Sequence, residues 1–296
     1  MSILVDRETR LLIQGITGTE GSRACKESLR YGTTVVAGVT PGKSGANVEG
    51  VPVYGSVEEA CKHHPGITAS LIVVPAPHAR AAALEAIEAK IPIITIVTEH
   101  VPTYDTACIV AAARAAEVQI IGPSSVGIIS PGKGKIGSIG LSLVEVFSPG
   151  PVGLISKSGG MTSEIALALT RAGFGQSTAL GIGADVIIGS DFADLLALFG
   201  NDEETKAIVL FGEVGGVSEE KAAEYLESTR FPKPVVALVA GAFSDRLPED
   251  TVLGHAGAIV SRGRGSYASK VSSLREAGVH VVERVEDIPV ALKTIL

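Results

Sequence analysis

Short apolar segments alternate with helical stretches along the chain, and this alternation constrains the fold more than any other feature of the sequence. Each apolar segment is followed by a turn with Gly or Pro and then by a stretch rich in Ala and Glu. This order is typical of buried strands joined by helices, and right-handed crossovers make such a unit a doubly wound α/β sheet of Rossmann type. In the first half, strands are expected at residues 11–16, 34–39, 69–74, 93–97 and 119–121, and helices at 20–29, 78–89 and 105–116, with a short helix opening at Ser56.

The alternation lapses and then restarts, which indicates two domains. Residues 122–151 are rich in Gly, Pro and Ser, and a second series of strands and helices begins at Val152. We therefore expect a Rossmann-type domain over residues 1–125, a linker over 126–150 and a second doubly wound domain over 151–296. The linker is too apolar and too regular in its glycines for simple disorder, so part of it could line a site. The second series predicts strands at 152–156, 178–182, 207–211, 235–239 and 279–282, and helices at 158–171, 191–199, 219–228 and 267–277.

Composition and charge narrow the class of protein. Among the 296 residues 46% are hydrophobic, only 4% are aromatic and none is Trp, so the cores must be built from Val, Ile, Leu and Ala. A formal net charge of −7 without clustered Lys or Arg argues against binding to nucleic acid or to a membrane surface. The three cysteines form no Cys-x-x-Cys pair, and no segment suits a signal peptide or a membrane span. These features favour a cytoplasmic protein.

The first strand ends in a glycine-rich turn, Gly15-Ile-Thr-Gly-Thr-Glu-Gly21, which opens the first helix. The N–H groups and the dipole of that helix N-terminus can hold a phosphate. An NAD site would also need an Asp or Glu after the second strand, to bind the ribose hydroxyls. The chain instead has Val39-Thr-Pro-Gly-Lys43-Ser there, and a lysine favours a nucleotide with a further ribose phosphate, either CoA or NADP. The alternative is a structural turn with a solvated Lys43.

Lys43 also lies in a run that looks at first like a Walker A loop, Gly38-Val-Thr-Pro-Gly42-Lys-Ser. The run has three residues between its glycines where that loop needs four, so any nucleoside triphosphate is expected mainly on another chain. Two further strand ends, Val74-Pro-Ala-Pro77 and Val97-Thr-Glu-His-Val-Pro102, fall at the carboxyl edge where doubly wound sheets bind ligands. The pair His63-His64 has no carboxylate or thiolate at ligand spacing, so no metal site is expected.

Three features of the second half could carry chemistry. The run Ser156-Lys-Ser158-Gly-Gly160 lies at a strand-to-helix junction and offers N–H groups and hydroxyls to an oxyanion, but it is not a G-x-S-x-G nucleophile elbow. Glu213 ends a strand among glycines and could orient an imidazole, the alternative being a solvated glutamate. His255, in Gly254-His-Ala-Gly-Ala-Ile, is either that imidazole or an exposed histidine in a turn of small residues.

Together these runs resemble the α subunit of succinyl-CoA synthetase (succinate–CoA ligase), essentially from end to end. The matching runs occur in the family's order, at residues 15–21, 38–43, 74–77, 173–178, 212–216 and 254–259. The resemblance implies an N-terminal Rossmann-type domain that binds CoA and a flavodoxin-like ligase domain. The residues that match the family's CoA contacts are Thr17, Gly18, Thr19, Glu20, Lys43, Val97, Thr98 and Glu99.

The resemblance also implies a reaction. A nucleoside triphosphate and the acid give an acyl phosphate, CoA attacks it to release the thioester, and phosphate moves through His255. His255 matches the histidine that the family phosphorylates transiently, and Glu213 the glutamate that supports it. The helix start at Ser158, Gly159 and Gly160 would hold phosphoryl oxygens or the substrate carboxylate. A β subunit with an ATP-grasp domain would bind Mg²⁺ and ATP or GTP, in an αβ or α2β2 assembly.

The sequence departs from the family at the expected acid pocket. Ser163 stands where a substrate-site tyrosine is expected, Lys157 replaces an arginine, and the Gly159-Gly160-Met161 run is similar to ATP-citrate lyase. In the linker, Ser124-Ser125 replaces the family's Asn-Cys pair. A sister ligase for citrate or malate is therefore the alternative to a ligase for succinate.

Two alternatives come from other classes of protein. A regulatory protein that binds CoA without turnover is one, and the presence of both Glu213 and His255 argues against it. An NADP-dependent dehydrogenase is the other, and it would need an acid/base pair near the nicotinamide, which the sequence does not offer.

Overall fold

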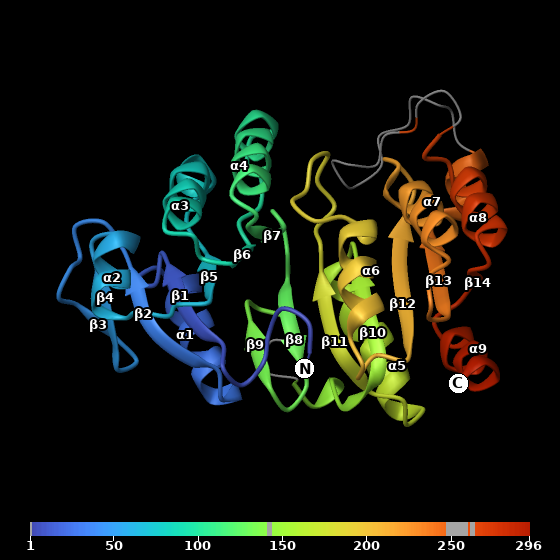
Figure 1. Cartoon of the computed structure of the whole chain (residues 1–296), viewed down its shortest axis with the longest axis horizontal. Helices are drawn as coiled ribbons and strands as arrows, with labels where there is room; N and C mark the ends of the chain where they lie inside the picture. Colours follow the sequence, from blue (N-terminus) through green and yellow to red (C-terminus); the bar gives the residue numbers. More distant parts are fainter. Residues whose placement is uncertain (1, 141–143, 247–259, 261–263) are drawn as a thin grey trace. The chain divides into compact units, whose positions relative to one another are not determined.

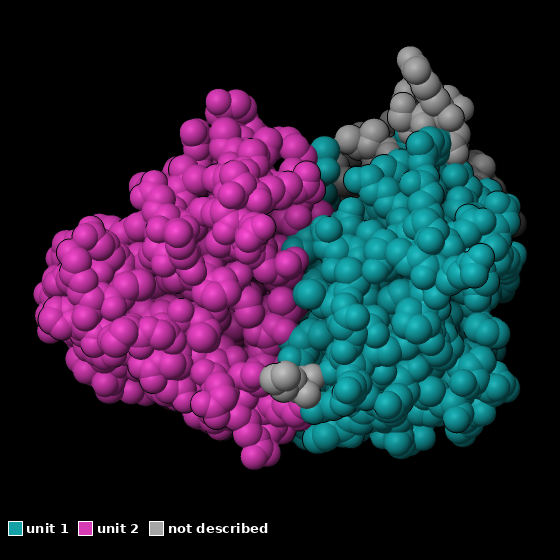
Figure 2. Space-filling model, in the orientation of Figure 1, with its two compact units in different colours: residues 1–3, 144–186, 190–296 teal, residues 4–143, 187–189 magenta. Residues whose placement is uncertain are grey.

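The computed structural model describes residues 2–140, 144–246, 260 and 264–296. The chain forms two compact α/β units, drawn as ribbons in Figure 1 and coloured separately in Figure 2. Unit 2 consists of residues 4–143 and 187–189, and unit 1 of residues 1–3, 144–186 and 190–296. The expected fold class, two α/β domains with mostly parallel sheets, is confirmed.

The sheet of unit 2 has the strand order β3-β4-β2-β1-β5-β6-β7, and its pairs are parallel except β3–β4. The chain builds outward from β1 in both directions, so β1 and β5 flank the switch point where doubly wound sheets place ligands. The strands are β1 (Arg10–Gln14), β2 (Thr34–Val39), β3 (Asn47–Val48), β4 (Val51–Tyr54), β5 (Ala69–Ile72), β6 (Ile93–Ile96) and β7 (Gln119–Ile121). The helices are α1 (Thr19–Tyr31), α2 (Val57–His63), α3 (Ala76–Glu88) and α4 (Thr103–Ala115).

Aliphatic side chains and alanines form the core of unit 2. The β1 residues 11–13 are fully buried. On α3, Ala79, Ala83 and Ala86 follow helical spacing on one face and are also fully buried, which lets the helix approach the sheet closely. The predicted Ser56 cap is present, since its Oγ accepts a hydrogen bond from the Glu59 N–H at 3.1 Å.

Two antiparallel hairpins of unit 2 were not expected from the sequence. In the first, β3 and β4 are joined by Glu49 and Gly50, whose φ angles of 52° and 86° are those of a type I′ turn. The second, β8 (Gly127–Ser130) and β9 (Gly134–Ile136), lies inside the segment expected to be a linker. Its strands are buried, so residues 127–136 are part of a packed unit.

Thr33 and Lys135 tie β9 to the rest of unit 2. The Thr33 Oγ1 donates to the Lys135 carbonyl at 2.9 Å and accepts from the Lys135 N–H at 2.8 Å. The Lys135 side chain is fully buried, with its Nζ 3.5 Å from Glu27 Oε2 on α1. Burial lowers the pKa of Lys135, and Glu27 opposes that shift. The hairpin thus rests on α1, the helix that opens with the glycine-rich turn.

Unit 1 contains the parallel strand order β14-β13-β12-β10-β11. The strands are β10 (Pro149–Ser156), β11 (Gln176–Gly181), β12 (Ala207–Glu213), β13 (Val235–Ala240) and β14 (His280–Val282). The helices are α5 (Gly159–Arg171), α6 (Phe192–Asn201), α7 (Ser218–Thr229), α8 (Tyr267–Glu276) and α9 (Asp287–Ile295), with short 3₁₀ turns at η1 (Val144–Val146) and η2 (Ala242–Arg246). The expected strands and helices are present with shifted ends, and α9 was not expected.

Side chains cap three of these helices, α5, α6 and α8, the last through Ser266, whose Oγ accepts from the Ser269 N–H at 3.1 Å. Asp191 forms a capping box on α6, because it accepts from the Asp194 N–H while the Asp194 side chain accepts from the Asp191 N–H. Ser158 caps α5, its Oγ accepting from the Met161 N–H at 3.5 Å. Within the described ranges, no helix is both long and apolar enough to cross a membrane.

Candidate functional site

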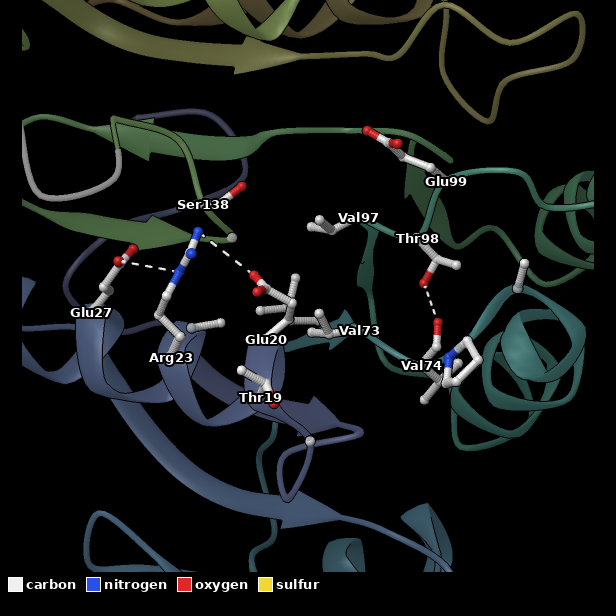
Figure 3. A pocket seen from close by; sticks show the side chains of 16 residues that line it. Thr19, Glu20, Arg23, Glu27, Val73, Val74, Val97, Thr98, Glu99 and Ser138 are labelled. Carbon is white, nitrogen blue, oxygen red and sulfur yellow. Dashed lines mark hydrogen bonds and ion pairs between the residues drawn. The ribbon is translucent and has the colours of Figure 1, made fainter.

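A cavity of about 650 Å³ opens at the carboxyl edge of the unit 2 sheet, beside the switch point (Figure 3). Its walls come from the start of α1, from the turns that follow β5 and β6, and from the residues after β9. The cavity is lined by Gly18, Thr19, Glu20, Arg23, Ala24, Glu27, Leu71, Val73, Val74, Pro75, Ala76, Val97, Thr98, Glu99, Gly137 and Ser138. Six of the eight residues expected to contact CoA therefore line one cavity.

Close backbone packing shapes the turn that begins α1. Gly18 is the N-cap of this helix and has no side chain to accept from its first N–H groups, which leaves them for a ligand oxygen. A Cβ at Gly21 would lie 2.1 Å from the Gly15 carbonyl oxygen, so only glycine fits where the helix folds back on the turn. Gly15 itself has a φ of 86°, in the left-handed region. The spacing of these glycines is thus a packing requirement as well as a binding feature.

The opposite wall is apolar and rigid. Val73, Val74 and Val97 line it, and a proline, Pro75, is the N-cap of α3. The Thr98 Oγ1 donates a hydrogen bond to the Val74 carbonyl at 2.7 Å, drawn as a dashed line in Figure 3, and so ties the turn after β6 to the turn after β5. Such a wall suits the uncharged part of an extended ligand.

Charged side chains of α1 form the remaining wall, and two of them, Arg23 and Glu27, were not predicted from the sequence. Arg23 lies 3.6 Å from Glu20 and 3.7 Å from Glu27, a ladder visible in Figure 3. The signal was the i, i+3 and i, i+4 spacing that places these side chains on one helix face. Gly137 and Ser138 were not singled out either, although their segment was expected to contribute to a site.

Thr17 and Lys43 do not line the cavity, but the structure brings both to one neighbouring turn. The Thr17 Oγ1 donates to Thr40 Oγ1 at 3.2 Å, and the Lys43 N–H donates to the Thr40 carbonyl at 3.1 Å. Both residues are exposed. Thr40 follows β2, which pairs with β1, so Lys43 belongs to the same sheet edge as the glycine-rich turn.

In unit 1, two predicted features lie at neighbouring strand ends. Strands β10 and β12 are parallel and paired, with Ser156 opposite Phe211. The Ser158 turn follows β10 and Glu213 ends β12, so both lie at the same edge of the sheet. A Cβ at Gly160 would meet nothing within 4 Å, and Ser163 is half-buried one turn into α5. His255, the third predicted feature, lies outside the described residues.

A buried carboxylate holds the turn that carries Glu213. The Glu213 N–H donates to Glu219 Oε1 at 3.1 Å. A Cβ at Gly212 would lie 2.5 Å from the same oxygen, so a side chain there would displace the carboxylate. Glu219, on α7, is a functional candidate that sequence reasoning missed, because Ser218-Glu219-Glu220 reads as an ordinary acidic helix start.

Neither histidine near α2 takes part in these sites. His63 ends α2 and its ring stacks on Tyr54 at 5.2 Å, while His64 Nε2 lies 2.8 Å from the Tyr54 hydroxyl oxygen. Burial, followed by the charges of Arg10 and His63, lowers the pKa of His64. In the part of the chain that the structure describes, no group of His, Cys, Asp and Glu side chains could hold a metal ion.

Both units match known families. Residues 6–100 match the CoA binding domain family and residues 155–280 match the CoA-ligase family. The fold and the cavity thus define a two-domain CoA-ligase subunit. The chain belongs to the family of succinate–CoA ligase α subunits, the family that the sequence analysis identified.

Two curated relatives are typical of this similarity. The chain is 44% identical to the succinate–CoA ligase [ADP-forming] subunit alpha 1 of Archaeoglobus fulgidus, over 100% of this chain and 99% of the relative. It is 46% identical to the corresponding subunit alpha of Methanothermobacter thermautotrophicus, over 95% of this chain and 93% of the relative.

The structural comparison points to a related enzyme. ATP citrate lyase from Methanothrix soehngenii, in complex with citrate and coenzyme A, superposes with a TM-score of 0.91 at 25% identity and covers 99% of this chain. The chain covers 50% of the length of that lyase. PH0766 from Pyrococcus horikoshii shares the fold, with a TM-score of 0.71 at 22% identity, over 96% of this chain and 59% of its own.

Proposed function

We propose that the chain is the α subunit of a succinate–CoA ligase that forms ADP. It would make succinyl-CoA from succinate, CoA and ATP, reversibly, through an acyl phosphate and a phosphohistidine at His255. The observation that carries this proposal is the 44% identity to an ADP-forming relative over 100% of the chain. The relatives' names also support ATP rather than GTP as the nucleotide.

The cavity of unit 2 fits CoA in size and chemistry. Its volume of about 650 Å³ lies in the usual range for ligand pockets. The first N–H groups of α1, which begin at Thr19 directly after the N-cap Gly18, and the Lys43 ammonium would bind phosphates, with Thr17 completing that end. Val97 and Thr98 would pack on the pantetheine arm. Glu20 and Glu99 would accept hydrogen bonds from its amides and hydroxyl or from the ribose.

The paired strand ends of unit 1 suit phosphoryl transfer. A His255 nitrogen would attack the γ-phosphorus of ATP, forming an N–P bond as the bond to ADP breaks. The phosphoryl group would then pass to a succinate carboxylate oxygen, and the CoA sulfur would displace inorganic phosphate from the acyl carbon. The helix start at Ser158, Gly159 and Gly160 would hold phosphoryl oxygens, Ser163 would contact the acid, and Glu213 would orient the imidazole.

A β subunit would complete this enzyme. We infer that it carries an ATP-grasp domain with Mg²⁺ and the nucleotide, in an αβ or α2β2 assembly. The sequence supports this division, because it contains no Walker A loop. A reducing cytoplasm suits the chain, whose cysteines Cys25, Cys61 and Cys108 are all free.

The phosphohistidine is tested by labelling. The chain, purified with its partner subunit, is incubated with Mg²⁺ and ATP labelled at the γ-phosphate, and the labelled peptide is identified by mass spectrometry. We expect acid-labile label on His255 and none in His255→Asn. Equal labelling of His255→Asn would refute the assignment, and CoA binding without any labelling would favour a regulatory protein without turnover.

The contact between Lys43 and the ribose phosphate is tested by a matched pair of ligands. Calorimetry compares CoA with dephospho-CoA, which lacks only that phosphate, on the wild type and on Lys43→Met. We expect the variant to bind CoA about tenfold more weakly, the usual effect of losing a charge-assisted hydrogen bond. Its affinity for dephospho-CoA should not change, and an equal loss for both ligands would contradict the contact.

Citrate is the second candidate substrate. The superposition on ATP citrate lyase at a TM-score of 0.91 favours it, as do the Gly159-Gly160-Met161 run, which is similar to that lyase, and Ser163, which is smaller than the expected tyrosine. The assay measures thioester formation from succinate, malate and citrate, each at the same concentration. It distinguishes a ligase for succinate from a ligase for citrate. Succinate turning over fastest supports the first proposal, and citrate turning over fastest would replace it.

A further inference from the structure

One buried carboxylate, that of Glu219, joins the elements around the proposed phosphoryl-transfer site. Glu219 lies in the first turn of α7 and its side chain is only 2% exposed. Its Oε1 accepts from the Lys157 Nζ at 2.9 Å and from the Glu213 N–H at 3.1 Å. Its Oε2 accepts from the Lys157 Nζ at 3.2 Å and from the Lys270 Nζ of α8. Both oxygens are therefore occupied by donors within unit 1.

The donors of Glu219 in turn fix other parts of the same edge. Lys157 directly precedes Ser158, the N-cap of α5. Lys270 also donates to the Gly215 carbonyl at 2.7 Å, so it ties α8 to the glycine turn after β12. The carboxylate thus connects the residue before the α5 start, the main chain of Glu213 and the Gly215 carbonyl.

Glu219 remains charged in this environment. Burial opposes its ionisation, but Lys157 and Lys270 outweigh burial and hold its pKa below the ordinary value. The carboxylate has no position left for a substrate proton. It therefore acts as a fixed anion and not as an acid or base in the reaction.

The next residue, Glu220, binds the segment that leads into α8 and its first turn. Its Oε1 accepts from the Gly265 N–H at 2.9 Å and from Ser269 Oγ at 3.2 Å. Gly265 also accepts a hydrogen bond from the Gly215 N–H at 2.7 Å. The start of α7 thus fixes both the Glu213 turn and the segment that leads into α8.

We propose that Glu219 is a positioning residue for phosphoryl transfer, holding the Glu213 turn in register with Lys157 and the Ser158 helix start. This inference rests on the proposed function, in which Glu213 orients the phosphorylated histidine. A network that only stabilised the fold would affect unfolding alone. A positioning network affects the transfer rate in protein that is still folded, because a displacement of about 1 Å can cost a hundredfold in rate.

Two variants test the network, and a third serves as the matched control. Glu219→Gln removes the charge but keeps the size. Lys270→Met removes the link to Gly215 and leaves Glu219 paired with Lys157, so it is the variant expected to fold even if unpaired lysines unfold Glu219→Gln. Glu227→Gln makes the same chemical change at an exposed position of α7.

Two measurements are made on each variant in complex with its partner subunit. Single-turnover labelling from ATP should be about a hundredfold slower in Glu219→Gln and about tenfold slower in Lys270→Met, and unchanged in Glu227→Gln. Hydrogen exchange should show faster exchange of residues 212–217 in both network variants, while CoA affinity, a property of unit 2, stays within about twofold of the wild type.

The outcomes separate the two proposals. If folded Lys270→Met labels at the wild-type rate, or if residues 212–217 keep their protection in it, the positioning role is wrong. If the wild type itself acquires no label, the proposed function fails, while the exchange measurement still decides whether the network holds the turn.

Discussion

Gly21 and Gly160 both lie in the first turn of a helix, yet their surroundings differ. A Cβ at Gly21 would overlap the Gly15 carbonyl at 2.1 Å, whereas one at Gly160 would meet nothing within 4 Å. The first glycine is therefore required by packing between the helix and the preceding turn. The second is not, because the position beside Gly160 is open.

We expect Gly21→Ala to lower the free energy of unfolding by about 1–3 kcal/mol, the usual cost of overpacking, and to weaken CoA binding by displacing the turn. Gly160→Ala should leave the stability unchanged or raise it by up to about 1 kcal/mol, since Ala has the higher helix propensity. Urea unfolding of both variants measures the difference. Equal loss of stability in the two would contradict the steric argument.

Burial suppresses the reactivity of the Cys25 thiol. Burial, assisted by the charge of Glu49, raises its pKa from 9.0 to about 11. At pH 8 its thiolate fraction should be about a hundredfold smaller than that of an unfolded cysteine. Iodoacetamide followed by peptide mapping should leave Cys25 unmodified in the native protein and modified in urea. Rapid native modification would contradict the burial.

The same shift makes a prediction about alkaline stability. Because the folded-state pKa of Cys25 is raised, its contribution to stability is full below pH 9.0 and is lost as the pH rises toward about 11. Cys25→Ala should therefore lose less stability than the wild type between those values. Parallel unfolding curves at pH 8 and pH 11 measure this, and identical losses would count against it.

Site residues were predictable from the sequence where one local turn defines them. Gly18, Thr19 and Glu20 belong to the glycine-rich turn, whose position after a strand predicted a phosphate site and whose match to the family named these residues as CoA contacts. Arg23 lies only a few residues further on but was missed, because its spacing on α1 is equally typical of a solvated helix face. Ser138 reaches the cavity through tertiary packing, which no local pattern encodes.

Helix capping makes a prediction for α6. Asp191 accepts from the Ala193 and Asp194 N–H groups at 3.0 and 3.3 Å. Asp191→Ala should lower the free energy of unfolding by about 1 kcal/mol, and Asp191→Asn by much less, since Asn also caps well. Lys221→Ala is the control for the exposed ion pair at 3.7 Å, and it should change the stability by less than about 1 kcal/mol. If Asp191→Asn lowered the free energy of unfolding as much as Asp191→Ala, the stabilisation would not come from the helix cap.

Long, periodic elements were the predictable part of the fold. The strands and helices of both sheets follow from apolar runs and Ala-rich stretches, whose pattern persists over enough residues to be recognised. The β3–β4 and β8–β9 hairpins were missed because their short strands lie in stretches rich in Gly and Pro, which are typical of loops. Helix α9 was missed although Pro289 stands near its start, where proline is favoured.

Ligand binding should affect the two units differently. CoA at about 100 times its Kd should add about 2.7 kcal/mol to the free energy of opening of the unit that binds it. Hydrogen exchange with and without CoA should therefore show added protection in residues 15–21, 71–76, 97–99 and 137–138. Strands β12 and β13 of unit 1 should exchange at unchanged rates. Protection confined to unit 1 would contradict the assignment of the cavity.

The hydrogen bonds between Thr33 and Lys135 determine when, during synthesis, the cavity of unit 2 can be completed. These residues are 102 positions apart, yet their pairing holds the hairpin that carries Gly137 and Ser138 to the cavity. During synthesis the N-terminal residues emerge first, and the sheet strands through β7 can form before β9 exists. The ribosome must extend the chain beyond Ser138 before the last wall of the cavity is in place. A nascent chain that ends with the matched CoA-binding segment, at residue 100, therefore has the turn for phosphates but an unfinished pocket.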